Sequence, residues 1–174
     1  MSIISRYYPY EYVEDVFSID YKALYEKGFR GLIFDIDNTL VPHGADSTEE
    51  IDKLFLRIHE TGLKTLLLSN NSEARVKRFK ENIDTLFIYD ANKPESDAFK
   101  QAVVMLGIKD EETIVVGDQV FTDIYGANMS GLASILVKYI GYYKKEKKGI
   151  RRNIEKVILY FYRHSRKYQH RLSL

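Results

Sequence analysis

The sequence predicts an α/β fold in which a parallel sheet of five strands is doubly wound, with helices on both faces. Short β-rich runs alternate with segments of helical periodicity, and this repetition is typical of a parallel sheet. The 174 residues can form one domain with its own core. They include no cysteine, which excludes disulfides, thiolate zinc sites and a cysteine nucleophile. The predicted strands are Gly31 to Asp35, Lys64 to Ser69, Thr85 to Tyr89, Thr113 to Gly117 and Ala133 to Val137.

Two of the intervening helices have recognisable ends. Ser47 and Glu50 have the spacing of a capping box, and Gly62 marks the end of the helix that follows. Pro94 opens the second helix and Gly107 ends it. The periodicity predicts two buried stripes: Ile51, Leu54, Phe55 and Ile58 in the first helix, and Phe99, Ala102, Val103 and Leu106 in the second.

The charged residues are divided unevenly along the chain. From Lys138 to the C-terminus there are 12 Lys/Arg and 2 Asp/Glu, whereas the preceding 137 residues hold 14 and 23. The formal net charge of +1 therefore combines an acidic body with a basic tail. We expect one domain over residues 1–140 and a basic amphipathic C-terminal extension over residues 141–174.

No stretch reaches the roughly 18 apolar residues of a membrane-spanning helix. Acidic residues near the start of the chain argue against a secretory or transit peptide. We therefore expect a cytoplasmic protein.

The basic tail favours an anionic partner, either a lipid surface or a nucleic acid. Its final helix is expected to carry one apolar face with Tyr160 and Tyr162 at the edges. That face could lie in a membrane interface or pack on the sheet, and both alternatives stay open. The polybasic run comprises Lys144, Lys145, Lys147, Lys148, Arg151 and Arg152, and the apolar face comprises Ile150, Ile154, Val157, Ile158 and Phe161.

Polar residues gather where the predicted strands end, which is where an open parallel sheet binds its ligands. We expect Asp35, Asp37 and Asp118 to crowd together there, and such a group of like charges needs a compensating cation. A hard divalent ion such as Mg²⁺, held by two carboxylates with an open face toward a phosphate, meets that need. Lys93 and the hydroxyl of Ser69 would stabilise the phosphoryl group.

These motifs resemble those of the haloacid dehalogenase (HAD) superfamily of phosphotransferases. They are the DxDxT motif of Asp35, Asp37 and Thr39, then Ser69, then Lys93, then Asp118 with Asp123. Finer features resemble the capless subfamily IIIA, which includes YqeG-type proteins and phosphatidylglycerophosphate phosphatases. The residues that carry this finer resemblance are Asn38, Leu40, Asn70, Asn71, Ala91, Pro94, Gln119 and Thr122, with an echo at Arg151, Arg152 and Glu155.

The resemblance implies a role for each motif residue. Asp35 would be the nucleophile, and Asp37 the general acid and then the general base. Mg²⁺ would be held by Asp35, Asp118 and the main-chain carbonyl of Asp37. Asp123 would orient Lys93 or a metal-bound water. The phosphoryl oxygens would be bound by Thr39, Ser69, Asn70 and Lys93, with Gln119 in a supporting position.

Several of these residues also have plain structural interpretations. Thr39 could be a turn residue, Ser69 a helix cap, Lys93 an exposed turn lysine and Asp123 an acid at a helix N-terminus. The histidines lack metal-binding spacing, and we expect surface or packing roles for His43, His59, His164 and His170.

The resemblance also implies the strand order 3-2-1-4-5 and no cap domain, since neither usual insertion point leaves room for one. An open site favours a phosphate on a large body. We expect conversion of phosphatidylglycerophosphate to phosphatidylglycerol at the inner face of the membrane, with anionic phospholipid as the partner. Two alternatives stay open: a phosphatase for a nucleic acid or protein phosphate, and a non-catalytic membrane- or ribosome-binding module.

Overall fold

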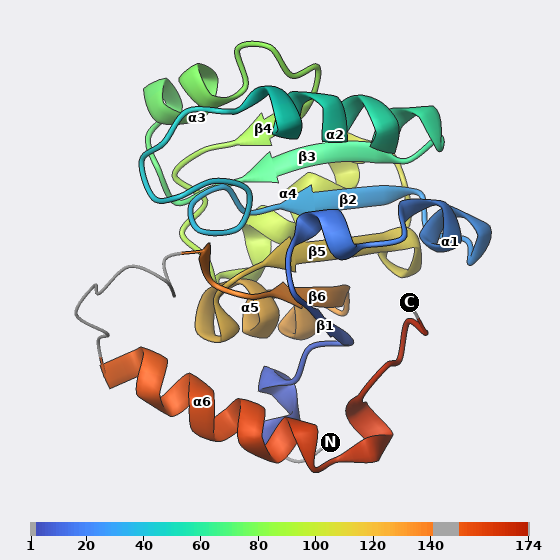
Figure 1. The fold of residues 1–174 in the computed structure, drawn as a ribbon, viewed down its shortest axis with the longest axis vertical. Helices are drawn as coiled ribbons and strands as arrows, with labels where there is room; N and C mark the ends of the chain where they lie inside the picture. Colours follow the sequence, from blue (N-terminus) through green and yellow to red (C-terminus); the bar gives the residue numbers. More distant parts are fainter. Residues whose placement is uncertain (1–2, 141–149, 174) are drawn as a thin grey trace.

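The computed structural model describes residues 3–140 and 150–173. Its centre is a parallel sheet of six strands in the order β1-β6-β5-β2-β3-β4 (Figure 1). The five predicted strands are present in the expected relative order, and the sixth strand, β1, extends the edge beside β6. The bounds are β1 Glu11–Val13, β2 Gly31–Phe34, β3 Lys64–Leu68, β4 Leu86–Ile88, β5 Thr113–Gly117 and β6 Ala133–Val137.

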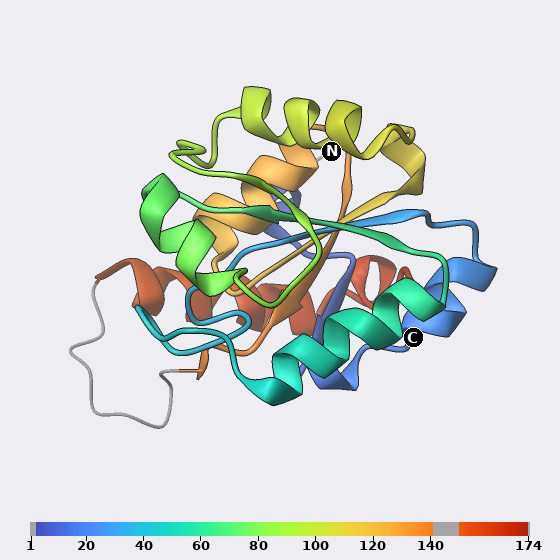
Figure 2. The ribbon, with the colours of Figure 1, turned by 90° about the horizontal axis from the view of Figure 1, so that it is seen from above.

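Helices cover both faces of this sheet, as the doubly wound prediction requires (Figure 2). Alternate residues of β2 point to opposite faces, so that Phe34 packs with Phe55 whereas Ile33 packs with Phe99. The first face is covered by α1 Tyr21–Glu26, α2 Glu49–Glu60 and α3 Glu73–Phe79, and the second by α4 Ser96–Leu106 and α5 Tyr125–Met129.

The predicted helix faces are confirmed, because all eight stripe residues are buried. The predicted cap of α2 is wrong by one position. Thr48 has extended backbone and its hydroxyl accepts the Ile51 amide at 3.3 Å, while Ser47 donates instead to Asp52. Gly107 ends α4 with φ +63°, as predicted for a left-handed terminus.

The final helix, α6 Ile150–Arg163, runs past the β1 and β6 edge of the sheet (Figure 1). It packs on the body through Ile158 and Tyr162, which join Tyr8, Val120 and Leu136 in a small apolar cluster. The division of the chain into a domain and an extension stays a prediction. Four of the predicted polybasic residues lie outside the described part of the chain: Lys144, Lys145, Lys147 and Lys148. The side chains of a fifth, Arg151, and of Ile150 in the predicted apolar face lie outside it too.

The predicted apolar stripe of α6 is only partly the packing face. Ile158 is 7% exposed, whereas Ile154, Val157 and Phe161 are 47%, 55% and 48% exposed. The helix therefore contacts the body along one face and leaves an apolar ridge of three residues on another. Over residues 3–140 and 150–173, no helix combines the length and the apolar character needed to cross a membrane.

The described residues 3–140 contain no cap domain at either usual insertion point. Between β2 and α2 there is a loop, and between β3 and α4 only α3 and β4 occur. Within these residues no inserted domain covers the strand ends, which is the side where α/β sheets bind ligands.

Candidate active site

The site is built where the sheet changes direction. From β2 the chain proceeds outward through β3 and β4, and then returns to place β5 on the other side of β2. Asp35 follows β2, and its amide bonds to the Val116 carbonyl of β5 at 2.9 Å. Asp118 follows β5 directly. Two neighbouring strands thus end in aspartates at the switch point, as predicted.

Three buried carboxylates meet there: those of Asp35, Asp118 and Asp123. One oxygen from each lies within 4.8 Å of the others. The sequence prediction put Asp37 in this group, but the third carboxylate is that of Asp123. An all-oxygen donor set is the kind that hard cations such as Mg²⁺ prefer. The residues present therefore fit a divalent ion, with Asp35 and Asp118 as expected ligands.

Lys93 is the cation of this cluster. Its ammonium lies 2.6 Å from Asp35 Oδ1 and 2.7 Å from Asp123 Oδ1, and its side chain is only 4% exposed. The interpretation as an exposed turn lysine is therefore wrong. Asp123 does lie in the first turn of a helical segment, but it is buried and its carboxylate binds Lys93, so it is more than an acid at a helix N-terminus. A buried lysine between two carboxylates is held charged, and both acids raise its pKa against the effect of burial.

Thr39 joins the two strand-end acids. Its hydroxyl lies 3.0 Å from Asp35 Oδ2 and 3.3 Å from Asp118 Oδ1. Thr39 itself is buried. This position gives Thr39 more than a turn role, because its hydroxyl is shared between the two carboxylates expected to hold the metal.

Desolvation dominates the electrostatics of the strand-end acids. Burial raises the pKa of Asp35 from 3.8 to about 6, with Lys93 opposing the shift and Asp123 adding to it. Burial raises the pKa of Asp118 to about 8, with Asp35 and Asp123 adding to it. A divalent cation would favour the ionised form of both groups. Positive charge close to these two carboxylates would therefore lower the pKa of both.

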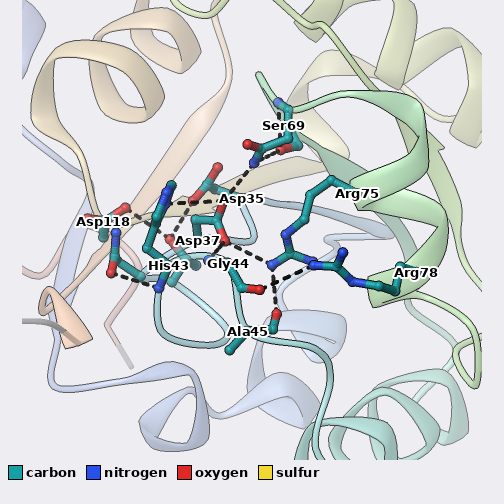
Figure 3. Close-up of polar contacts among 12 residues, drawn as sticks. Asp35, Asp37, His43, Gly44, Ala45, Ser69, Arg75, Arg78 and Asp118 are labelled. Atoms are coloured by element: carbon teal, nitrogen blue, oxygen red, sulfur yellow. Dashed lines mark hydrogen bonds and ion pairs between the residues drawn. The ribbon is translucent and has the colours of Figure 1, made fainter.

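Asp37 faces a different set of partners, shown in Figure 3. Its Oδ1 accepts from the Gly44 amide and from Arg75 Nη2, each at 2.9 Å. Its Oδ2 accepts from Asn71 Nδ2 at 2.6 Å, and His43 Nδ1 lies 3.5 Å from it. Burial opposes ionisation of this group, but the hydrogen bonds from Gly44, Arg75 and Asn71 hold its pKa below the ordinary value. The side chain is thus fixed beside the acidic cluster rather than within it.

Ser69 and Asn70 organise the turn after β3. Ser69 Oγ accepts from the Asn71 amide at 3.2 Å and from Asn71 Nδ2 at 2.9 Å. Asn70 Oδ1 accepts from the Lys93 amide at 2.7 Å. Ser69 does not cap α3, whose N-cap is Ser72. Phosphate binding by Ser69 and Asn70 stays a prediction, and their present contacts position Asn71 and the main chain of Lys93.

Gly117 and Gln119 set the position of Asp123. A Cβ on Gly117 would lie 2.4 Å from the Asp123 side chain, so only glycine permits this close approach. The main-chain amide of Gln119 donates a hydrogen bond to Asp123 Oδ2 at 3.1 Å. Asp123 itself lies in a π-helical segment, Val120–Ile124. Such segments are frequent at functional sites.

Sequence reasoning assigned no site role to three of the residues that contact the motif acids. Arg75 and His43 contact Asp37, although His43 was expected to be a surface or packing residue. Arg152 of α6 donates to the carboxylate of Asp118 and, at 3.0 Å, to its main-chain carbonyl. The carboxylate of Glu155 accepts hydrogen bonds from Arg152 Nη1 at 2.9 Å and from the Val120 main-chain amide at 3.1 Å. The Arg-Arg-x-x-Glu pattern was the available signal for the last pair.

Comparison with known proteins agrees with this fold. Residues 90–158 match the HAD-hydrolase-like family. The structure resembles that of an uncharacterized protein from Listeria monocytogenes serotype 4b, with a TM-score of 0.54, 17% identity, and coverage of 79% of this chain and 100% of that one. It also resembles a HAD family hydrolase from Deinococcus radiodurans R1, with a TM-score of 0.50, 14% identity and coverage of 64% and 92%. Both structures share the fold of this chain.

Sequence relatives narrow this class. The chain is 41% identical over 130 residues to a Bacillus subtilis protein named "Probable phosphatase YqeG", covering 74% of this chain and 76% of that protein. It is 27% identical over 146 residues to phosphatidylglycerophosphate phosphatase 1, chloroplastic/mitochondrial, of Arabidopsis thaliana, covering 75% of this chain and 40% of that protein. The chain therefore belongs to the YqeG-type phosphatases among the HAD-like hydrolases.

Proposed function

We propose that this phosphatase hydrolyses phosphomonoesters with Mg²⁺ through an aspartyl-phosphate on Asp35. The observation that carries the proposal is the buried group of three carboxylates with Lys93 bound to two of them. Acids buried this closely destabilise a fold unless they bind a cation or do chemistry. Bound Mg²⁺, held by Asp35, Asp118 and the main-chain carbonyl of Asp37, would neutralise charge on the transferring phosphoryl group.

The side chains support two successive displacements. A carboxylate oxygen of Asp35 attacks phosphorus and the bond to the leaving oxygen breaks. Asp37, which is ionised at rest, would take up a proton from solvent before this step and give it to the leaving oxygen. Water then attacks the phosphorus of the acyl phosphate while Asp37 takes a proton from that water. The bond between phosphorus and the Asp35 oxygen breaks, which frees inorganic phosphate and restores the Asp35 carboxylate. Lys93, helped by Thr39, Ser69 and Asn70, would stabilise the phosphoryl oxygens, while Asp123 and Gln119 keep Lys93 in place.

The substrate that we propose is phosphatidylglycerophosphate, reached from the cytoplasmic face of the membrane. The name of the Arabidopsis relative supports this substrate class. The exposed ridge of Ile154, Val157 and Phe161 supports a lipid surface as partner, because an apolar helix face flanked by cations suits a membrane interface. In this proposal residues 1–140 form the catalytic domain and residues 141–174 the extension that contacts the anionic leaflet.

The proposal is tested by phosphate release from phosphatidylglycerophosphate in mixed micelles containing Mg²⁺. We expect turnover by the wild type and a loss of at least about a thousandfold in Asp35→Asn, because that variant lacks the nucleophile. Asp84→Asn is the matched control, since Asp84 is an exposed acid before β4, at the opposite end of the sheet. A phosphorylated Asp35 should be trapped in the wild type.

Two results would contradict parts of this proposal. Full activity of Asp35→Asn would exclude the aspartyl-phosphate route. Activity on a phosphorylated nucleic acid end or phosphoprotein, with none on the lipid, would keep the chemistry and overturn the substrate.

A further inference from the structure

A groove of about 640 Å³ lies between α6 and the β1 and β6 edge of the sheet. It begins at Asp118 and Arg152 and continues along the helix past Lys156 to Arg163. Since the carboxylate of Asp118 lies within 4.8 Å of that of Asp35, one end of the groove adjoins the proposed nucleophile. A molecule whose phosphate reached Asp35 could therefore extend into it.

The groove carries more positive than negative charge. Near its inner end, Arg152 is paired with Asp118 and Glu155, and Lys138 is paired with Glu14. Farther out, Lys156 and Arg163 are both exposed, and within residues 3–140 and 150–173 neither is in an ion pair. Among the described residues, the outer part of the groove thus has two cations outside any ion pair, and Glu155, which also lines the groove, is held by Arg152.

The spacing of these cations fits an elongated ligand. Arg152, Lys156 and Arg163 lie at intervals of four and seven residues, so they share one face of α6. Lys156 and Arg163, the two cations outside an ion pair, are separated by about 10 Å along the helix axis. Both can therefore contact different parts of one elongated ligand.

The other walls of the groove are apolar or aromatic. Leu136, Val137 and Leu159 line it, together with the ring of Tyr12, over which Arg163 lies at 5.5 Å. Carbon atoms of a ligand would be covered by these side chains while its charges met the cations. The lining thus matches an anionic organic molecule better than inorganic phosphate.

We propose that this groove binds a second anionic group on the substrate, with a phosphodiester as the expected chemistry. The proposal rests on the proposed function, because it places the phosphomonoester of the same molecule at Asp35. Lys156 and Arg163 then act as specificity-determining residues that favour substrates carrying both a phosphomonoester and a phosphodiester. Neither residue takes part in bond breaking.

Three related compounds test this proposal with the full-length protein. Glycerol 3-phosphate carries only the monoester, glycerophosphoglycerol only the diester, and glycerophosphoglycerol phosphate both. We expect the KM of the wild type to be about tenfold lower for glycerophosphoglycerol phosphate than for glycerol 3-phosphate, which is the gain expected from one added charge-assisted contact. In Lys156→Gln/Arg163→Gln the KM for glycerophosphoglycerol phosphate should be higher, so that the preference over glycerol 3-phosphate is lost.

The matched control is Arg166→Gln/Lys167→Gln, which removes two cations from the segment after α6 that do not line the groove. It should keep the preference of the wild type. A preference that is absent in the wild type, or equal in both double variants, would overturn the groove as the subsite.

Direct binding separates this proposal from the phosphatase proposal. Glycerophosphoglycerol, which has no monoester to hydrolyse, should shift amide resonances of groove residues in NMR titrations of the wild type and not of Lys156→Gln/Arg163→Gln. If the wild type hydrolysed neither phosphomonoester, the proposed function would fall. The titration would still decide whether the groove binds a phosphodiester.

Discussion

Arg152 of α6 donates hydrogen bonds to both the carboxylate and the main-chain carbonyl of Asp118, which directly follows β5. The guanidinium also lies 4.3 Å from the centre of the Tyr139 ring. Arg152 therefore holds one oxygen of a carboxylate expected to bind Mg²⁺. Because arginine is always charged, removing Arg152 should change the affinity of the acidic cluster for another cation.

Replacing Arg152 by glutamine should strengthen Mg²⁺ binding about fivefold, or by ~1 kcal/mol. The variant frees an oxygen of Asp118 and removes a positive charge that repels the ion. Isothermal titration of the full-length protein with MgCl₂ measures this directly. Arg166→Gln, which removes a cation away from the site, is the control and should bind as the wild type does. Weaker binding by Arg152→Gln would instead show that Arg152 holds Asp118 in the metal-binding geometry.

Replacing Lys93 by methionine should lower the free energy of unfolding by about 3–5 kcal/mol, because it leaves two buried carboxylates without their cation. Urea unfolding measures the loss. Adding Asp123→Asn to the same chain should restore part of it, since one of the unpaired charges is then gone. The control Lys77→Met removes an exposed lysine paired with Glu73 and should change stability little. An unchanged midpoint for Lys93→Met would contradict the buried ion-pair geometry.

The sequence could predict the strands and the acids at their ends because both are local signals. Apolar runs ending in Asp35 or Asp118 specify strand and site together, and Lys93 sits in the short turn after a strand. Arg75 gave no such signal, and Arg152 was marked only by the Arg-Arg-x-x-Glu pattern. Each lies on a helix, where an arginine is usually solvated, and its acidic partner is 38 or 34 residues away. Only the packing of α3 and α6 brings them to the site.

The edge strand and the place of Asp123 within the acidic group were not predicted, for related reasons. β1 spans only three residues, Glu11–Val13, and pairs with a strand near the other end of the chain. Its short run has no pattern that distinguishes it from a loop. The inclusion of Asp123 in the acidic group depends on Gly117, whose missing side chain leaves room for it. That steric relationship is visible only in the folded chain.

Replacing Arg75 by glutamine should lower kcat about tenfold with little change in KM. Arg75 donates to Asp37 Oδ1 and, at 2.7 Å, to the Ala45 carbonyl, so it fixes the proposed acid and base relative to its loop. Loosening a positioned acid costs more in the transition state than in substrate binding. Steady-state kinetics with glycerol 3-phosphate separate the two parameters. Lys77→Gln is the control on the same helix, because Lys77 is exposed and pairs with Glu73. Equal kinetics for the two variants would remove Arg75 from the positioning role.

Tyr162 links α6 to the body, and its ionisation gives a test of that packing by pH. Burial, with Glu11 adding to it, raises the pKa of Tyr162 from 10.0 to about 12. The unfolded chain would ionise near 10, so the folded state retains this proton over a range where the unfolded state has lost it. The stabilisation from this group is therefore fully present below pH 10 and is lost as the pH rises through about 12.

The Tyr162→Phe variant should show this difference in urea unfolding. Relative to its value near pH 9, the free energy of unfolding of the wild type should fall by on the order of 2 kcal/mol more than that of the variant by about pH 12. Tyr160→Phe is the control, because Tyr160 is 59% exposed and should leave the pH dependence unchanged. If the curves of the wild type and Tyr162→Phe ran parallel across this range, Tyr162 would be accessible to water, and α6 would not be packed against Tyr8 and Leu136 in solution.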